Sequence, residues 1–425
     1  MVKHLTGLVA LAAIGTLLLA GCAGTPIASE PAGNTGGEIA AAPGFDPATK
    51  TIRIGSLVPV SGVFAGAVTN LQGMQAYFDI ATAVGGDLEG YTIELDNQDT
   101  KYDPATAIPL YNGMKDNVSM FSMMLGAPII DALLPSMEDE GILGVPAGII
   151  PKFLREPNLL PTFPNLNAYH AAAVDYAANE KGMKDAVFCA TTTEDVFGDS
   201  ILDAFNFSTE DLALTVGTTV KFAGNTDFTA QIIELKDKGC EVVLMGGVGP
   251  VMQNFAVKAV QLDFNPVLLA SNTSYTVTIA TGPGADWLKE HALFAVTGTE
   301  WGADEAPGQP TLEASLATQG TEIVPTANAY QTGFVNAKVT VDVLAKAISN
   351  GDMSRAGILK VAHEELGDVD DLGMGGGTYS YGTSVEDRVP PHLMSFFTVS
   401  SDVPAGLALE TYNYDSKVAA KLELQ

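Results

Sequence analysis

Short apolar runs rich in β-branched residues alternate with longer helical runs along most of this chain. The first series contains "TIRIGSLV" and "YTIELDNQD", and each run precedes a helical stretch. The rhythm restarts near Asn167 and then brings "DAVFCATTT", "EVVLMGGVG" and "PVLLASN". Apolar strands that alternate with helices are typical of a parallel sheet covered on both faces. Two such series predict an α/β fold of two doubly wound parallel-sheet lobes, which a length of 425 residues allows.

The turns that follow the predicted strands are the expected place for a ligand. Ligands of doubly wound sheets bind beyond the carboxyl ends of the strands. The first such turn, "PVSGVFAG", has no lysine and no phosphate-loop spacing, so it is not a nucleotide-binding loop. The candidate turns are Ser61–Gly66, Asp99–Tyr102, Gly126–Pro128, Ala147–Gly148, Thr191–Phe197, Gly246–Pro250 and Asn272–Tyr275.

The N-terminal segment, residues 1–21, predicts a lipoprotein signal peptide. Its apolar run from Leu5 to Leu19 is shorter than the ~20 residues that span a bilayer. The "LAGC" that ends at Cys22 resembles the bacterial lipobox, whose cysteine becomes the lipid anchor. An ordinary signal peptide with a chance cysteine is the alternative. Residues 22–50 then indicate the acylated cysteine and a flexible tether, because Gly, Ala, Pro, Ser and Thr dominate there.

The net charge limits the kinds of partner that the chain can bind. The positions of the cysteines bear on whether it contains a disulfide. A formal net charge of −29 argues against nucleic acid or anionic lipid, since both require clustered Lys and Arg. Export permits a disulfide between Cys189 and Cys240. However, we place Cys189 near the C-terminal end of one strand and Cys240 just before the start of another. Opposite ends of a parallel sheet are too far apart for a bridge, so we expect two free, buried thiols.

The sequence lacks the common motifs of catalytic and cofactor sites. The five histidines are scattered, and "AHEEL" lacks the second histidine of a zinc protease helix. The sequence has no G-x-S-x-G elbow, Walker loop or full dinucleotide motif. We therefore expect no catalytic residues, metal or cofactor, and no enzyme activity. An envelope hydrolase is the competing class, and it would need a nucleophile–base pair.

Several stretches occur together in an order and spacing known from one family. They are "IGSLVPVSGVFAGAV", "LDNQDTKYDPATA", "MEDEGILGVPAG", "EDVFGDSILDAF", "TDFTAQIIELKDKGCEVVLMGGVGP" and "NAYQTGFVNAKVTVDVLAKAI". From about Thr51 to the C-terminus, the chain resembles the type I periplasmic binding proteins of branched-chain amino-acid ABC transporters, the Leu/Ile/Val-binding group. The resemblance implies three hinge crossings, near Phe163–Asn167, Ala295–Trp301 and Gly375–Tyr381. Lobe 1 would then combine residues 51–162 and 300–375, and lobe 2 residues 167–294 and 382–425.

The resemblance also implies a function and a location. The protein would be an extracytoplasmic solute-binding lipoprotein of an ABC importer, which captures a small organic solute between its lobes and presents it to a permease in the cytoplasmic membrane. It would be a monomer, held by its lipid anchor on the outer face of that membrane in the cell envelope. The alternative is a ligand-sensing lipoprotein that reports to a membrane receptor without transport, because one fold serves both roles.

The family's ligand contacts, transferred position by position, imply a binding site with unusual side chains. Where amino-acid binders have hydroxyl groups, this chain has Ala127, Pro128 and Gly148, and Asn272 replaces the acidic partner of the ligand's ammonium. A buried ammonium without a carboxylate costs several kcal/mol. We therefore expect a carboxylate or amide with a hydrophobic or aromatic body in preference to leucine or valine. The expected contacts are Ser61, Phe64, Ala127, Pro128, Ala147, Gly148, Phe197, Val248, Asn272 and Trp301.

Overall fold

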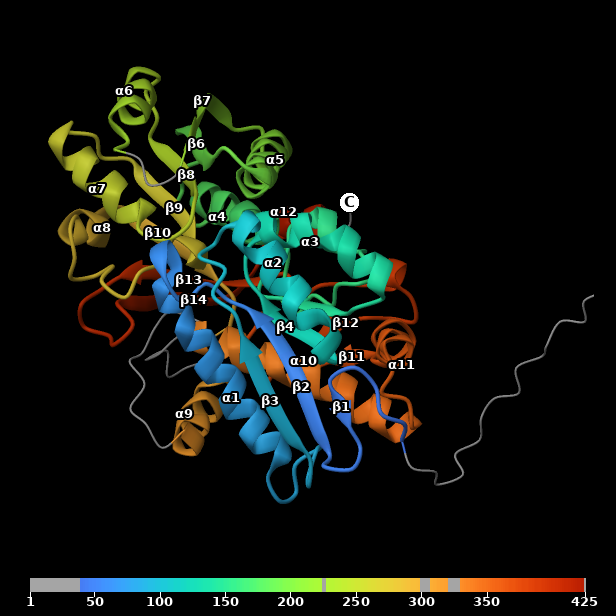
Figure 1. The fold of residues 1–425 in the computed structure, drawn as a ribbon. Coiled ribbons are helices and arrows are strands. Elements are labelled where there is room, and N and C mark those ends of the chain that lie inside the picture. Colours follow the sequence, from blue (N-terminus) through green and yellow to red (C-terminus); the bar gives the residue numbers. More distant parts are fainter. Residues whose placement is uncertain (1–38, 224–226, 299–305, 320–328, 424–425) are drawn as a thin grey trace, which may run out of the picture. The chain divides into compact units, whose positions relative to one another are not determined.

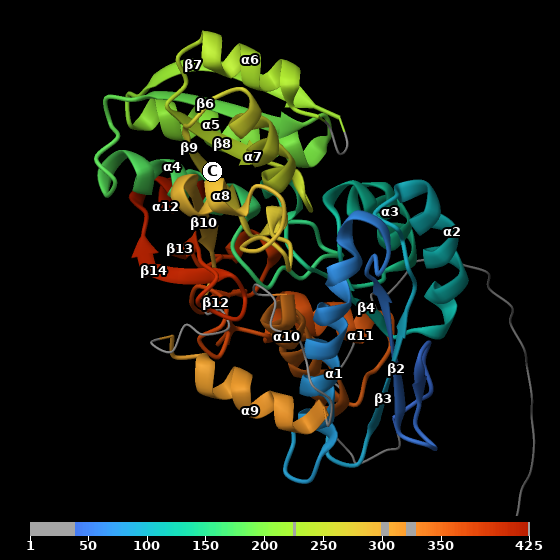
Figure 2. The same cartoon turned by 90° about the vertical axis from the view of Figure 1, so that its left-hand side faces the viewer.

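Two large sheets carry the fold of this chain (Figures 1 and 2). The structure is a computed structural model that describes residues 39–223, 227–298, 306–319 and 329–423. Cys22 and Trp301 lie outside these residues. Both sheets belong to one compact unit, 38–425.

The first sheet is built around β2, which pairs in parallel with β3 on one side and β4 on the other. Because the chain crosses β2 between β3 and β4, the connection through α1 and the connection through α2 run over opposite faces. Helices α1 and α10 pack together on one face, and α2 and α3 lie on the other (Figure 2). The strands are β1 (Phe45–Asp46), β2 (Thr51–Leu57), β3 (Thr92–Asn97), β4 (Met120–Met124) and β5 (Gly144–Pro146). The helices are α1 (Val68–Thr82), α2 (Pro104–Met114), α3 (Ala127–Glu140), α9 (Gln309–Gln319), α10 (Ala329–Asn350) and α11 (Arg355–Lys360).

The second sheet has the order β14-β13-β10-β9-β8-β6-β7. The strands from β7 to β10 are parallel, whereas β13 and β14 extend the sheet in antiparallel fashion. Its strands are β6 (Val187–Thr193), β7 (Thr215–Phe222), β8 (Val242–Gly246), β9 (Val267–Ser271), β10 (Ala292–Val296), β13 (Leu393–Val399) and β14 (Leu407–Asp415). Its helices are α4 (Leu166–Asn179), α5 (Val196–Asp211), α6 (Thr229–Asp237), α7 (Val251–Gln261), α8 (Ala285–His291) and α12 (Lys417–Glu423). A separate small sheet pairs β11 (Asp368–Val369) with β12 (Tyr379–Ser380).

The predicted α/β class with two doubly wound, parallel-sheet lobes is confirmed. The order of the strands shows that the chain returns to the first lobe with α10 and then to the second with β13. The residue boundaries of the lobes remain a prediction. Phe45 falls inside the segment expected as a tether, yet it forms β1 with Asp46 and is only 4% exposed. The buried Phe45 ring and the backbone pairing with β2 hold this short strand in place.

The expectation of two free thiols is wrong, because Cys189 and Cys240 form a disulfide. Strand β6 begins at Val187 and continues to Thr193, so Cys189 lies near its N-terminal end and not its C-terminal end. In the parallel register, Cys189 lies opposite Val243 of β8, three residues after Cys240. The two Cα atoms are 5.8 Å apart, within the range that a disulfide spans.

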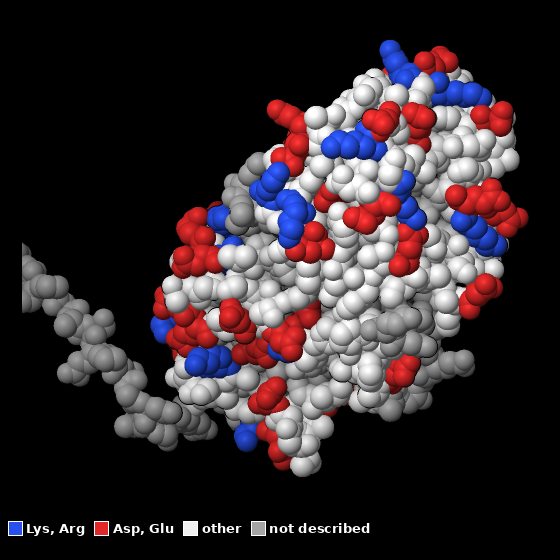
Figure 3. Space-filling model, turned by 180° about the vertical axis from the view of Figure 1, so that it is seen from behind, with Lys and Arg blue, Asp and Glu red and all other residues white. Residues whose placement is uncertain are grey.

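The surface of the described residues mixes both signs of charge. On the face in Figure 3, Lys and Arg lie among Asp and Glu and do not gather into a basic patch. Several of these charges are paired, as between Arg53 and Glu94 at 2.8 Å. None of the helices in the described part of the chain is both long and apolar enough to span a membrane.

Helices α1 and α10 approach each other until their backbones touch. A Cβ atom on Gly73 of α1 would overlap the carbonyl oxygen of Tyr330, and one on Gly333 of α10 would overlap that of Asn70. Glycine is therefore required at both positions, because any side chain would push the helices apart. Near the same crossing, the rings of Tyr77 and Phe334 meet edge to face at 4.9 Å between centroids.

We expect Gly333→Ala to lower the free energy of unfolding by about 3 kcal/mol, because the added methyl group meets rigid backbone. Gly113→Ala in α2 is the matched control, since nothing lies within 4 Å of the added atom. The control should leave stability unchanged or raise it slightly. Denaturant unfolding measures both, and equal stability of the two variants would contradict the close contact.

Reduction of the disulfide should destabilise the protein by about 4 kcal/mol, the loop-entropy value for a separation of 51 residues. Guanidinium unfolding with and without reductant measures this difference. The double variant Cys189→Ala/Cys240→Ala is the control, because its stability should no longer respond to reductant. A wild-type protein that is indifferent to reductant would show that the bridge is absent in solution.

Candidate functional site

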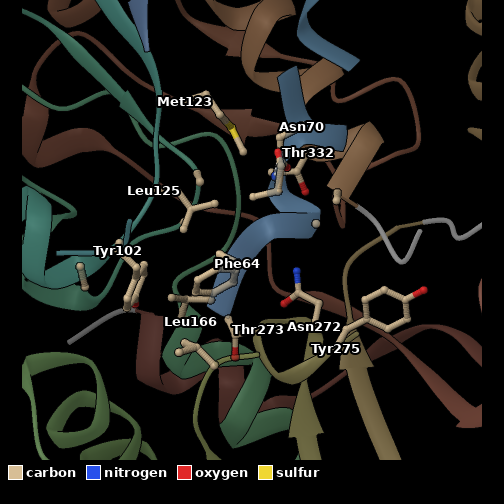
Figure 4. A pocket seen from close by; sticks show the side chains of 18 of the residues that line it. Phe64, Asn70, Tyr102, Met123, Leu125, Leu166, Asn272, Thr273, Tyr275 and Thr332 are labelled. Atoms are coloured by element: carbon tan, nitrogen blue, oxygen red, sulfur yellow. Dashed lines mark hydrogen bonds between the residues drawn. The ribbon is translucent and has the colours of Figure 1, made fainter. Parts of the chain in front are cut away.

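A pocket opens where strands of both sheets end. Its walls come from the turns after β2, β3, β4, β5, β8 and β9, from the first turns of α4 and α5, and from α1 and α10 (Figure 4). Its cavity volume is about 290 Å³. This position beyond the carboxyl ends of parallel strands is where doubly wound folds bind ligands.

Seven of the ten residues expected from the sequence line this pocket. They are Phe64, Ala127, Ala147, Gly148, Phe197, Val248 and Asn272. Ser61 and Pro128 are not among its lining residues, and Trp301 is outside the described part of the chain. That these residues bind a ligand is a proposal.

Ser61 does not line the pocket but holds two of the turns that do. Its hydroxyl donates to Asp99 Oδ2 at 2.6 Å, and the backbone N–H groups of Val60 and Lys101 donate to Asp99 Oδ1 at 3.0 Å. The hydrogen bond from Ser61 holds the pKa of the Asp99 carboxyl below its ordinary value. The turn after β2 is thereby fixed to the turn after β3, which positions Phe64 and Tyr102.

An aromatic wall forms from these two turns. The rings of Phe64 and Tyr102 are tilted against each other with centroids 4.8 Å apart. Gly126, at φ +121°, lets the Tyr102 ring lie against the chain, because a Cβ atom there would be 2.9 Å from Tyr102 Cε2. Burial raises the pKa of Tyr102, and the nearby Asp195 raises it further, so the phenol stays neutral.

Further lining residues were not singled out from the sequence. Tyr102, Thr273 and Tyr275 lie in turns that the sequence marked as candidates, so their positions carried a usable signal. The lining residues in helices and strands could not be identified from the sequence, because their spacing is that of ordinary core positions. These residues are Asn70, Met123, Leu125, Leu166, Tyr169 and Thr332.

The polar groups of the pocket are neutral. None of the described residues that line it is Asp, Glu, Lys, Arg or His. Helix α3 begins here with no side chain capping its N-terminus, and within the described residues the backbone N–H groups of Ala127 and Gly148 have no hydrogen-bond partner. Thr273 and Ser274 instead direct their hydroxyls to the Gly247 carbonyl, each at 2.9 Å. Such a pocket can bind an anionic or neutral group through backbone N–H donors, but it offers no counter-charge to a cation.

No group of three or more His, Cys, Asp or Glu side chains that could hold a metal ion occurs in the described ranges. One histidine is buried next to the pocket. His170 directly follows the lining residue Tyr169 on α4, and its Nδ1 donates to the carbonyl of the lining residue Leu166 at 2.6 Å. Burial lowers the pKa of His170 to about 4, so the ring is neutral at pH 7.

Comparison with known proteins agrees with this architecture. The profile of the periplasmic binding protein family matches residues 51–404 of the chain. The chain belongs to the periplasmic binding protein family. It is thus a member of a family of extracytoplasmic solute-binding proteins, which are not enzymes.

Solved structures of other periplasmic binding proteins share the fold. A fatty acid ABC transporter substrate-binding protein from Thermomonospora curvata is 21% identical, with a TM-score of 0.82 over 91% of this chain and 97% of that one. A branched chain amino acid ABC transporter protein from Thermus thermophilus with bound valine is 15% identical, with a TM-score of 0.72 over 88% and 98%. A leucine binding protein from Thermotoga maritima is 18% identical, with a TM-score of 0.69 over 85% and 98%.

The buried His170 should make this periplasmic binding protein sensitive to acid. The imidazole titrates near 6.5 in the unfolded chain and near 4 in the folded protein, so the unfolded state binds the proton first as pH falls. The free energy of unfolding should therefore drop by about 3 kcal/mol between these two pH values. Urea unfolding across this range should show a smaller decrease for His170→Gln than for the wild type. Parallel pH profiles of the two proteins would contradict a neutral, buried ring.

Proposed function

We propose that this chain is the solute-binding lipoprotein of an ABC importer and that it captures a carboxylate or amide with a hydrophobic or aromatic body. Cys22 would carry the lipid anchor on the outer face of the cytoplasmic membrane, and a permease in that membrane would receive the solute. The protein would act as a monomer whose two lobes, 51–162 plus 300–375 and 167–294 plus 382–425, move about the three crossings.

The observation that carries this proposal is a pocket with aromatic and aliphatic walls and, among its described lining residues, no charged side chain. Ligand sites of this kind bury an apolar body and orient it through a few polar groups. An α-amino acid would bring an ammonium that finds no carboxylate among the lining residues that the structure describes. A carboxylate or amide requires only hydrogen-bond donors, which Ala127 and Gly148 supply at the uncapped start of α3 and beside it.

The names of the similar structures agree with a solute that joins a carboxylate to an apolar body. The protein from Thermomonospora curvata is described as binding fatty acids, and those from Thermus thermophilus and Thermotoga maritima as binding branched-chain amino acids or leucine. Both solute types join a carboxylate to an apolar body. The neutral walls of this pocket favour the type that lacks an ammonium.

A thermal-shift panel tests the proposal with straight-chain acids, aromatic acids, their amides, and leucine, isoleucine and valine. We expect acids and amides to stabilise the protein by about 2.7 kcal/mol at a hundredfold excess over Kd, following RT ln(1 + [L]/Kd). Stabilisation by the three amino acids alone would refute the proposed solute class.

Phe197 should contribute to binding through its buried ring, which is 2% exposed. Phe197→Ala should weaken binding of the best acid by about 1–3 kcal/mol, measured by calorimetry. Phe207→Ala on the same helix is the matched control, because Phe207 does not line the pocket. An equal loss in both variants would indicate a general effect of truncation on α5.

A further inference from the structure

Met123 lines the pocket from inside a strand, which no other described lining residue does. The other lining residues lie in helical turns or in the segments between elements. Met123 belongs to β4 and is fully buried. In the view of Figure 4 it lies with Asn70 and Thr332 at one end of the pocket, whereas Leu166 and Thr273 lie at the other. We call the end formed by Met123, Asn70 and Thr332 the inner end.

A β-bulge turns Met123 toward the pocket. Ser122 and Met124 of β4 pair with two consecutive residues of β5, so Met123 between them is an extra residue. The pairing of β4 with β2 is irregular at the same place. Met123 has a φ of +59°, in the left-handed region that a bulky residue rarely adopts. Bulges and strained residues of this kind re-aim side chains and gather beside functional sites.

Hydrogen bonds hold both the backbone and the side chain of Met123 in this orientation. The Ser56 hydroxyl donates to the Met123 carbonyl at 3.3 Å, and Asn336 Nδ2 donates to Met123 Sδ at 2.9 Å. Asn336 is itself fixed, because it accepts from Thr162 and also donates to the Pro146 carbonyl at 3.2 Å. A methionine side chain normally adapts its shape easily. This one is held at its sulfur, so it forms a wall of defined position.

We propose that Met123 sets the length of the apolar body that the pocket accepts. The carboxylate or amide of the solute would lie at the start of α3, and the body would extend past Leu125 until its end meets the Met123 thioether. This inference rests on the proposed function, and it narrows the solute class to acids and amides whose body fits between the start of α3 and the inner end.

The packing at the inner end gives affinity a sharp dependence on length. Each methylene that is buried against apolar walls raises affinity about fourfold. Once the chain touches Met123, a further methylene has to displace a side chain that is held at its backbone and at its sulfur. Close-packed interiors do not take up extra atoms without strain, so affinity should then fall. An unrestrained side chain at this place would instead give a flat dependence.

Calorimetry with straight-chain acids from butanoate to tetradecanoate, and with their amides, tests this proposal. For the wild type, affinity should rise with chain length to an optimum and fall beyond it. Met123→Ala shortens the side chain by about three heavy atoms, so the optimum should move to a chain about three carbons longer. Met123→Gly should move the optimum at least as far. Glycine also suits the positive φ, so this second variant relieves the backbone strain that alanine would keep.

Met124→Ala is the matched control. Met124 is the next residue of β4 and is equally buried, but it does not line the pocket, and its sulfur lies beside Gly144 of β5. The substitution should lower the stability of the protein and leave the optimal chain length unchanged.

The outcomes separate the two proposals. The same optimal length in the wild type and in the folded Met123 variants would overturn the role of Met123 and leave the proposed function intact. An equal shift in Met124→Ala would also overturn it, because a general loosening of β4 would then explain the result. Binding of no acid and no amide by the wild type would overturn both proposals. Thermal melting without ligand shows which variants are folded.

Discussion

The backbone contact between α1 and α10 determines the position of α10 and, with it, the packing of the first lobe and one end of the pocket. Neither Gly73 nor Gly333 tolerates a side chain, so a helix from the last third of the chain is held against one from the first lobe. From that position, α10 places Asn336 between the ends of β4 and β5, where it also accepts from Thr162. The contact completes the core of the first lobe and closes one end of the pocket in the same step.

The fold class could be predicted because apolar strands and helices alternate regularly along the sequence. Two series of apolar strands and helices specify parallel sheets with both faces covered, and the structure confirms this. The disulfide could not be predicted correctly because it depends on where a strand begins. Placing Cys189 at the wrong end of β6 moved it away from Cys240, although the parallel register brings the two together. The antiparallel strands β13 and β14 also lie outside the alternating pattern.

The candidate site also has a part that the sequence predicts and a part that it does not. Turns after strands have a fixed place in a doubly wound fold, so the sequence located Phe64, Phe197 and Val248 beside one pocket. Asn70 and Thr332 occupy helix positions that only a tertiary contact turns toward the pocket. Ser61, also expected from the sequence, donates its hydroxyl to Asp99 and is not among the residues that line the pocket. Local pattern therefore predicts where a pocket forms better than it predicts which polar groups face it.

The neutral wall of the pocket also affects how fast a solute is captured. With a formal net charge of −29, the field around the chain repels an approaching anion, and no cation among the described lining residues offsets it. Salt shortens the range of this repulsion, since the Debye length falls from ~30 Å at 0.01 M to ~8 Å at 0.15 M. A carboxylate of the proposed class would thus associate faster at high salt than at low salt, whereas the association rate of an amide would stay nearly constant. In fresh water, the kinetic advantage would belong to the uncharged solute.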